Sequence, residues 1–274
     1  MRRDCYSYRS GSVTRAATSL VASFLDELLA IREVADHADA HNGLQVENHG
    51  EVAWIVAAVD ASLATIEAVA RTKRSQPGLL VVHHGLFWDG TQPLTGRRFQ
   101  RVSTLIRHDI ALYSAHIPLD LHPEIGNNVL LARRLGLEIE GRFGEYRGAP
   151  IGIWGKAPAP IRSREGLVAA LAKALDLSPD AITFISGAPS TIQRVGVITG
   201  AAGDMVAAAR EAGLDTFITG EGPHHSYFDA MEWGINLVYA GHYATETLGV
   251  QALAARAAER FSLPWEFSDH PTGL

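Results

Sequence analysis

The sequence predicts an α/β protein of two similar α/β domains related by an internal pseudo-repeat, with the functional site in the cleft between them. The first observation is the order of predicted elements. Strand, small-residue turn, helix and strand occur over residues 55–85 and again over 195–225. The second is a phrase that occurs at 113–120 and at 239–246, in which Tyr, two small residues and His precede an acid. Such alternation indicates parallel strands joined by right-handed crossovers.

Strands in the first half are expected where apolar runs are near-continuous, as is typical of strands buried on both faces. They lie at 52–59, 79–82 and 110–114. Apolar residues at helical spacing predict helices over 20–35, 63–73, 99–108 and 127–135. Asp60-Ala61-Ser62 offers N-cap candidates for the second helix, and Gly136 suits the C-cap of the fourth.

The second half repeats this order. We expect strands at 195–198, 216–219, 235–239 and 263–267, and helices over 205–212, 227–233 and 245–260. Between the halves, four glycines make the stretch after residue 140 rich in turns, and 164–175 is predicted to be helical with Ser163 as its cap. Pro158 and Pro160 mark a boundary nearby. One domain is therefore expected to span 20–150 and the other 151–274.

The residues before the first predicted helix, 1–19, are basic and rich in Ser, Thr and Arg. They lack the continuous apolar core of a secretory signal. A transit peptide would have a similar composition, but we favour a disordered tail or an overlong start.

Composition restricts the functional classes. The 274 residues are 47% hydrophobic, enough for a sizeable core, and the net charge of −6 gives no global basic footprint for nucleic acid. No apolar run approaches the roughly 20 residues that a membrane span needs. Cys5 is the single cysteine, so an intramolecular disulfide is impossible, which fits a reducing, cytoplasmic location.

Histidines and acids gather at the predicted strand ends. The doublet His83-His84 follows one strand, and His224-His225 follows the corresponding strand of the second half. Ligands collect outside the carboxyl ends of parallel strands. Adjacent histidines point in different directions, so each can serve one of two cations, and a carboxylate can bridge cations about 3.5–4 Å apart. Imidazole with carboxylate suits zinc, iron, manganese or nickel better than calcium or magnesium.

Each of these residues also has a structural interpretation. A lone His near a strand end is commonly a satisfied polar residue, Asp120 could be a helix cap, and Glu246 could complement a helix dipole. His and acids are poor packing residues, so their repetition favours a function. The turn Thr199–Gly203 resembles a phosphate cradle but lacks the lysine of a P-loop, and we interpret it as a tight strand-to-helix turn.

Several stretches together resemble the NGG-interacting-factor-like family of dinuclear metal-centre proteins, whose members are often called GTP cyclohydrolase type 2 homologues. The stretches are HNGLQV at 41–46, VVHHGLFW at 81–88, YSAHIPLD at 113–120, GNNVLLARRLGL at 126–137 and the whole of 218–254. Any one of them is a weak signal, whereas the combination is specific. The resemblance extends from about residue 20 to the end of the chain.

The resemblance implies five metal ligands, namely His83, His84, Asp120, His242 and Glu246. Glu246 would bridge two divalent ions (zinc, iron or manganese), and the two residues of the doublet at 83–84 would be divided between them. It also implies that His116, His224 and His225 line the cavity, where they could shuttle protons or orient substrate as catalytic residues. Members of the family commonly assemble as toroidal hexamers, so a homo-oligomer is expected.

The chain departs from the family pattern at two positions. The family commonly has Asp before the Asn-x-Gly-Leu phrase, where this chain has His41, and Ile117 stands in place of a Thr. Neither residue is a proposed ligand.

These observations predict a metal-dependent hydrolase acting on a nucleotide or another phosphate-bearing small molecule. Two divalent ions would lower the pKa of a water between them. GTP ring opening is what the family name suggests, but the resemblance supports the site better than that substrate. The alternative is a non-catalytic metal-binding or regulatory protein that acts through protein partners. An open coordination position distinguishes the two, because a storage site can be closed. In either case the two phrases predict one shared site.

Overall fold

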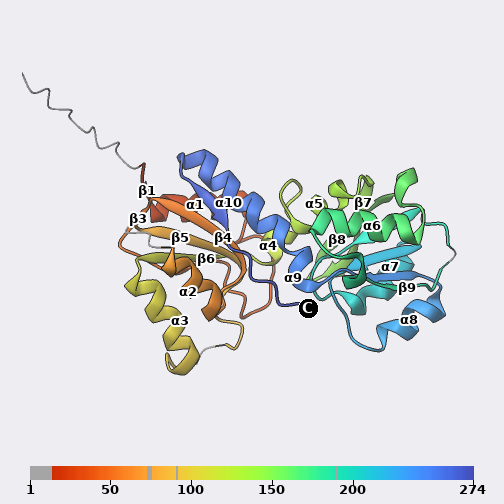
Figure 1. The fold of residues 1–274 in the computed structure, drawn as a ribbon, viewed down its shortest axis with the longest axis horizontal. Coiled ribbons are helices and arrows are strands. Elements are labelled where there is room, and N and C mark those ends of the chain that lie inside the picture. The colour runs from red at the N-terminus through yellow and green to blue at the C-terminus, as the bar shows by residue number, and fades with distance from the viewer. Residues whose placement is uncertain (1–13, 73–75, 91, 189) are drawn as a thin grey trace, which may run out of the picture.

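The apolar runs of the first half form the centre of a five-stranded sheet in the order β13-β4-β5-β6-β2. Its strands are β2 (Gly43–Val46), β4 (Trp54–Asp60), β5 (Gly78–His84), β6 (Ile110–Ser114) and β13 (Trp265–Phe267). Strands β13, β4, β5 and β6 run parallel, and β2 pairs antiparallel with β6. The computed structural model describes residues 14–72, 76–90, 92–188 and 190–274 (Figure 1).

Alternate residues of these strands face two separate apolar clusters, as the two-residue period of a strand requires. Ile55 and Ala57 pack with helices α1 (Thr18–Leu29) and α10 (Thr247–Phe261). The side chains between them pack on the other face with α2 (Leu63–Arg71) and α3 (Gly96–Arg107). The sheet is therefore covered on both faces.

A six-stranded sheet in the order β7-β8-β10-β11-β12-β9 forms the second lobe. Its strands are β7 (Glu138–Tyr146), β8 (Ala149–Lys156), β9 (Thr183–Ile185), β10 (Arg194–Val197), β11 (Thr216–Thr219) and β12 (Asn236–Tyr239). Helices α5 (Asn127–Arg134) and α6 (Arg164–Leu175) contribute to the apolar cluster on one face. Helices α7 (Val206–Glu211) and α8 (Ser226–Trp233) contribute to the cluster on the other. Short 3-10 helices occur at Ala159–Ile161, Pro179–Ala181 and Gly203–Met205.

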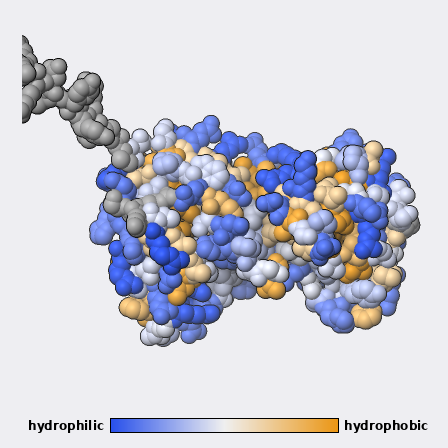
Figure 2. Space-filling view, viewed as in Figure 1, coloured by the Kyte–Doolittle hydropathy of each residue, from blue (hydrophilic) through white to orange (hydrophobic). Residues whose placement is uncertain are grey.

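The predicted architecture of two similar α/β domains is confirmed. Each sheet contains three parallel strands in sequence order, β4-β5-β6 and β10-β11-β12, with a helix between successive strands. In each sheet an antiparallel strand pairs with the last of these three strands. It is β2 beside β6 in the first sheet and β9 beside β12 in the second. Figure 1 shows the two lobes side by side, and Figure 2 shows a narrower waist between them.

The chain passes between the two sheets twice, and both passages lie in the repeated phrase. After β6 it enters α4 (Ile117–Asp120) on its way to the second sheet. After β12 it enters α9 (His242–Thr245) and then α10, which returns to the first sheet.

The sheets do not divide the chain at residue 150, so the predicted boundary is wrong. Strand β7 already lies in the second sheet, while α10 and β13 belong to the first lobe, although the prediction gave 151–274 to the second domain. The reason is packing. Val250, Leu253 and Ala257 of α10 are fully buried in the first lobe, and Trp265 pairs with Ile55 of β4.

The stretch expected to be rich in turns forms the β7–β8 hairpin instead. Its turn is Arg147-Gly148, where both residues have positive φ (49° and 87°), as a two-residue hairpin loop requires. Gly152 does not mark a turn. A Cβ there would lie 2.5 Å from Phe143 Cε1, so the glycine makes room for a ring on the paired strand.

The N-terminal prediction is also partly wrong. Ala16–Ala17 forms strand β1, which pairs with β3 (Glu51–Val52), and α1 begins at Thr18, so the disordered tail predicted over 1–19 does not extend through these residues. Residues 1–13 lie outside the described residues. Within the part of the chain that the structure describes, no helix combines the length and hydropathy needed to cross a membrane.

Candidate metal centre

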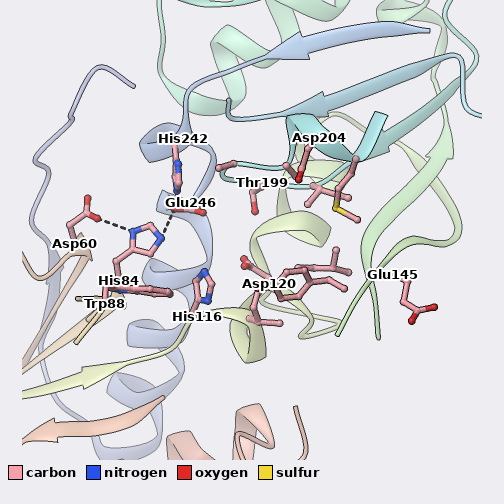
Figure 3. Close-up of a pocket in the computed structure, with 17 residues that line it drawn as sticks. Asp60, His84, Trp88, His116, Asp120, Glu145, Thr199, Asp204, His242 and Glu246 are labelled. Atoms are coloured by element: carbon pink, nitrogen blue, oxygen red, sulfur yellow. Dashed lines mark hydrogen bonds and ion pairs between the residues drawn. The ribbon is translucent and has the colours of Figure 1, made fainter. Parts of the chain in front are cut away.

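Three strand ends bring the predicted ligands together at the waist between the lobes (Figure 3). Strand β5 ends at His83 and His84, whose side chains leave opposite faces because the strand alternates. Asp120 is the last residue of α4 after β6. His242 begins α9 after β12, and Glu246 follows that helix. All five predicted metal ligands therefore lie close together.

Glu246 lies at the centre of this group and faces its neighbours with both oxygens. Its Oε1 is 3.6 Å from His83 Nε2, and its Oε2 is 3.4 Å from His84 Nε2 and 3.2 Å from His242 Nε2. Asp120 Oδ2 is 3.5 Å from His83 Nε2. The donors thus form two sets that share one carboxylate.

Hydrogen bonds at Nδ1 fix the orientation of each imidazole. The acceptors are Ala115 O for His83, Asp60 Oδ1 for His84, Asp36 Oδ1 for His116 and Glu221 Oε1 for His242, at 2.8, 2.8, 2.8 and 2.6 Å. A carbonyl or carboxylate oxygen can only accept, so Nδ1 carries the proton. In a neutral ring the lone pair then lies on Nε2, the arrangement found in metal-binding histidines.

The donor set fits a divalent cation. His83 and Glu246 are 0% and 3% exposed, and neither His83 Nε2 nor Glu246 Oε2 has a hydrogen-bond partner among the described residues. Buried polar atoms without partners are costly, and a cation would satisfy both. In each of two groups, the ligand atoms lie within 4.8 Å of one another. One group is His83, His84 and His116, and the other is His84, His242 and Glu246. These His/Glu groups could hold a metal ion.

In the metal-free chain, protons take the place of a cation's charge. Burial of the His83 ring lowers its pKa, but the charges of Asp120 and Glu246 raise the pKa well above its usual value. Burial of Glu246 raises its pKa, but the charges of His83 and His84 and contact with His242 lower the pKa well below its usual value. Burial lowers the pKa of His242, whereas Glu246 and then Glu221 raise that pKa to about 9.

Two neighbouring residues shape the space around the carboxylates. Asn127 Nδ2 donates to Asp120 Oδ1 at 2.8 Å, which leaves Oδ2 to face His83. Gly200 approaches Glu246 so closely that a Cβ there would lie 2.3 Å from Oε1. Gly200 also has a positive φ of 72°, so glycine is required on both counts. The small-residue turn after β10 thus gives Glu246 the room that it needs.

A cavity of about 680 Å³ opens beside the candidate ligands, with walls from both lobes (Figure 3). His84, His116, Asp120, His242 and Glu246 line its metal-ligand end. The cluster is therefore accessible from one side.

The structure brings His116 to the site and leaves His224 and His225 away from it. The His116 ring centroid is 5.0 Å from that of His83, and His116 lines the cavity. His224 and His225 are exposed just before α8 and do not line the cavity, so the expectation that they do is wrong for this chain. Strand β11 ends at Thr219, and the residues that follow carry the second doublet away from the strand end.

Sequence reasoning missed the acids that orient the histidines. Asp60 appeared only as a helix-cap candidate, and Asp36 and Glu221 were not singled out. Asp36 Oδ2 accepts from Asn42 Nδ2 at 2.8 Å, so an acid does contact the segment Asn42-Gly43-Leu44, although His41 precedes it. A search for acids just after predicted strands would have found Asp60 and Glu221, but not Asp36, which follows a predicted helix.

A family model and several known proteins match this chain over most of its length. The model of the family Duf34/NIF3 (NGG1p interacting factor 3) matches residues 16–272. A Deinococcus radiodurans protein named GTP cyclohydrolase 1 type 2 homolog is 44% identical over 234 residues, which cover 85% of this chain and 86% of that protein. A Pyrococcus abyssi protein of the same name is 41% identical over 254 residues, with 93% and 98% covered.

Solved structures give the same result. The crystal structure of TTHA1606 from Thermus thermophilus superposes with a TM-score of 0.82 at 35% identity, covering 94% of this chain and 100% of that one. The protein ybgI, of unknown function, gives 0.84 at 33% identity with the same coverage. The family model and these relatives each cover most of the chain, which therefore belongs to the Duf34/NIF3 (NGG1p interacting factor 3) family.

Proposed function

We propose that this protein is a metal-dependent hydrolase with a dinuclear divalent-metal centre, acting on a nucleotide or another phosphate-bearing small molecule. The observation that carries the proposal is the position of Glu246. One of its oxygens faces His83, and the other faces His84 and His242, within a buried group of donors. A carboxylate shared in this way is the usual bridge between two cations.

One ion would take His83, Asp120 and Glu246 as ligands, and the other would take His84, His242 and Glu246. Nitrogen and oxygen donors of this kind suit zinc, iron or manganese. When bound, two such ions act as Lewis acids and lower the pKa of a bound water, which supplies hydroxide near neutral pH.

The chain's own residues orient the ligands and leave room for substrate. Asp60 and Glu221 hold two of the histidines through Nδ1, and Asp36 holds His116 in the same way. His116 borders the cavity with Nε2 available, so it is our candidate for moving a proton to or from substrate. The cavity also gives the centre an open side, which favours catalysis over storage.

The names of the relatives agree with a nucleotide substrate but apply to those proteins. The Deinococcus radiodurans and Pyrococcus abyssi proteins are both named GTP cyclohydrolase 1 type 2 homolog. We therefore place nucleotides first among the candidate substrates.

A screen of the metal-loaded protein tests this proposal. Purified protein is loaded with manganese, iron or zinc, its metal content is measured, and nucleotides and phosphoesters are tested for turnover. We expect about two ions per chain and turnover of at least one compound. A folded protein that binds no metal would overturn the centre.

Loaded protein that turns over nothing would instead favour a non-catalytic metal-binding or regulatory protein acting through partners. One observation favours this second candidate. Helix α8 exposes four large apolar side chains, Tyr227, Phe228, Met231 and Trp233. Such patches mark interaction surfaces.

We further propose a homo-oligomer, a toroidal hexamer, in the cytoplasm. The apolar face of α8 supports an assembly, because an exposed patch of this kind is usually covered. Light scattering after size-exclusion chromatography measures the mass, and a monomer at micromolar concentration would contradict the assembly.

A further inference from the structure

Apart from its histidines, the charged side chains among the described residues that line the cavity are all acidic. They belong to Asp60, Asp120, Glu145, Asp204 and Glu246, and no Lys or Arg lines it. Asp120 and Glu246 belong to the proposed centre, and Asp60 is hydrogen-bonded to His84. The charge left to face a substrate is therefore that of Asp204 and Glu145, which Figure 3 shows on the side away from His84.

Most backbone amides of the turn at 199–203 do not provide an anion site in their place. This turn, which resembles a phosphate cradle, donates four of its five amides inside the protein. The amides of residues 199, 200, 202 and 203 donate to Asn128 Oδ1, Thr245 Oγ1, Thr219 Oγ1 and Glu221 O, at 2.7, 3.1, 3.1 and 3.0 Å. Phosphate binding at a turn depends on N–H groups that point at the ligand. These four amides are already engaged.

One part of the cavity wall is apolar. Tyr146, Ile151, Ile198 and Met205 line it and belong to one apolar cluster. A Cβ on Gly144 would lie 3.0 Å from Met205 Cε and 3.1 Å from Ile198 Cδ1, so Gly144 packs closely against these two side chains. Aromatic, thioether and aliphatic groups form good surfaces for the face of a ring.

We infer that the cavity recognises its substrate through an uncharged heteroaromatic ring and holds no polyphosphate chain. The face of the ring packs against the apolar wall, and N–H groups on its edge donate to Asp204. The metal centre receives a single oxygen-bearing group, such as a carbonyl or one phosphate. A triphosphate would place several negative charges among carboxylates without a cationic side chain. The inference rests on the proposed function, which supplies the metal ions.

A second hollow beside the cavity is the alternative place for a polyphosphate to bind. This hollow, of about 270 Å³, shares Asp60, His84 and Trp88 with the cavity and is lined by Arg101, whose Nε is buried without a hydrogen-bond partner among the described residues. If phosphates were recognised, Arg101 would be the side chain to bind them. The experiment therefore includes this residue.

Binding of guanosine, GMP and GTP to the manganese-loaded protein tests the inference. Calorimetry gives the three dissociation constants, and metal content is measured again after each titration. We expect GTP to bind no more than about threefold tighter than GMP, because phosphates beyond the first find no cationic side chain. Asp204→Asn should weaken guanosine binding on the order of tenfold, the usual effect of losing a charged hydrogen-bond partner. Asp180→Asn, an exposed carboxylate of the same lobe outside the cavity lining, is the matched control.

Three outcomes would overturn the inference. One is affinity that rises with each phosphate and falls in Arg101→Gln. Another is guanosine binding that Asp204→Asn leaves unchanged, and the third is no guanosine binding at all. The first leaves the hydrolase proposal intact. Conversely, loaded protein that binds guanosine through Asp204 but turns over nothing would support the inference and remove the hydrolase.

Discussion

At the scale of single residues, the histidines and Glu246 of the candidate metal centre each use two atoms. Each histidine uses Nδ1 to bind an acceptor, so its other nitrogen is directed at the cluster. Glu246 uses both oxygens, and it is the one predicted ligand that faces both sets of donors. Losing this carboxylate would therefore affect two cations, whereas losing one imidazole would affect one.

We predict that Glu246→Gln removes most of the bound metal. The amide is neutral, and its NH₂ group cannot coordinate a cation, so the bridge loses both its charge and one ligand atom. Metal per chain is measured by elemental analysis after dialysis against metal-free buffer. His225→Ala is the control, because His225 is exposed and lies outside the cavity lining. Equal and negligible losses in both variants would refute the ligand assignment.

Metal affinity of the metal-free protein should rise with pH up to about 9. The pKa of His242 is raised from 6.5 to about 9, so a cation must displace its proton below that pH. The raised pKa also stabilises the metal-free fold. This contribution is full below pH 6.5 and is lost as the pH rises through about 9.

Titrating manganese into the metal-free protein from pH 6.5 to 9.5 checks this dependence. The apparent affinity is expected to rise by about tenfold per pH unit for one displaced proton. Glu221→Gln removes one cause of the raised pKa, so its profile should level off at lower pH. An affinity that does not change with pH in the native chain would contradict the prediction.

At the scale of elements, a short polar side chain joins three parts of the second lobe. Asn128 of α5 donates through Nδ2 to Ile151 O at 2.9 Å, and its Oδ1 accepts from Thr199 N at 2.7 Å and Thr199 Oγ1 at 3.0 Å. Asn128 is 0% exposed. It therefore ties α5 to β8 and to the turn after β10 without help from water.

Replacing Asn128 with Ala should destabilise the protein by about 2–4 kcal/mol, because the variant leaves buried donors and acceptors without partners. Denaturant unfolding of the metal-free protein measures the change. The control is Gln100→Ala on α3, where the amide is exposed. We expect that control to change the free energy of unfolding by no more than about 0.5 kcal/mol. A loss in Asn128→Ala no larger than in the control would contradict the prediction.

Elements with a strong local signal could be predicted from the sequence. Strand β6 and helix α6 have the predicted bounds, since β6 is a short continuous apolar run and Ser163 caps α6 by accepting from Gly166 N. The β7–β8 hairpin could not, because Gly141 and Gly152 make room for rings on the paired strand, those of Trp154 and Phe143. Pairing of β13 with β4 likewise depends on a contact between distant parts of the chain.

The same distinction applies to the site. The candidate ligands stand in phrases whose residues are neighbours in the chain. Repetition drew attention to these phrases, and the family resemblance implied the five residues. Asp36 and His116 are separated by 80 positions, and only the folded chain brings them together. His224 and His225 show the converse, because a doublet that looks equivalent in sequence lies on an exposed turn.

At the scale of the whole molecule, one lobe is continuous in sequence and the other is not. The strands of the second sheet all fall between residues 138 and 239. The first sheet needs β13, and α10 covers one of its faces, so its last parts are made at the end of the chain.

We predict that a fragment of residues 126–241 folds alone, whereas a fragment of 14–136 does not. The first contains the second sheet with α5 to α8. The second lacks α10 and β13, so one face of its sheet is covered by α1 alone. Circular dichroism with urea unfolding distinguishes a cooperative transition from none. Adding residues 242–274 through a flexible linker to the fragment 14–136 should restore its transition. Cooperative unfolding of 14–136 without that addition would contradict the prediction.

The two passages of the chain between the sheets both carry candidate ligands, Asp120 on the way out and His242 with Glu246 on the way back. The lobes are thus joined by two connections that meet at one point, and anything bound there grips both. Ions held by Asp120 and Glu246 would link the outgoing and the returning connection, so we expect metal binding to restrict rotation of one lobe against the other.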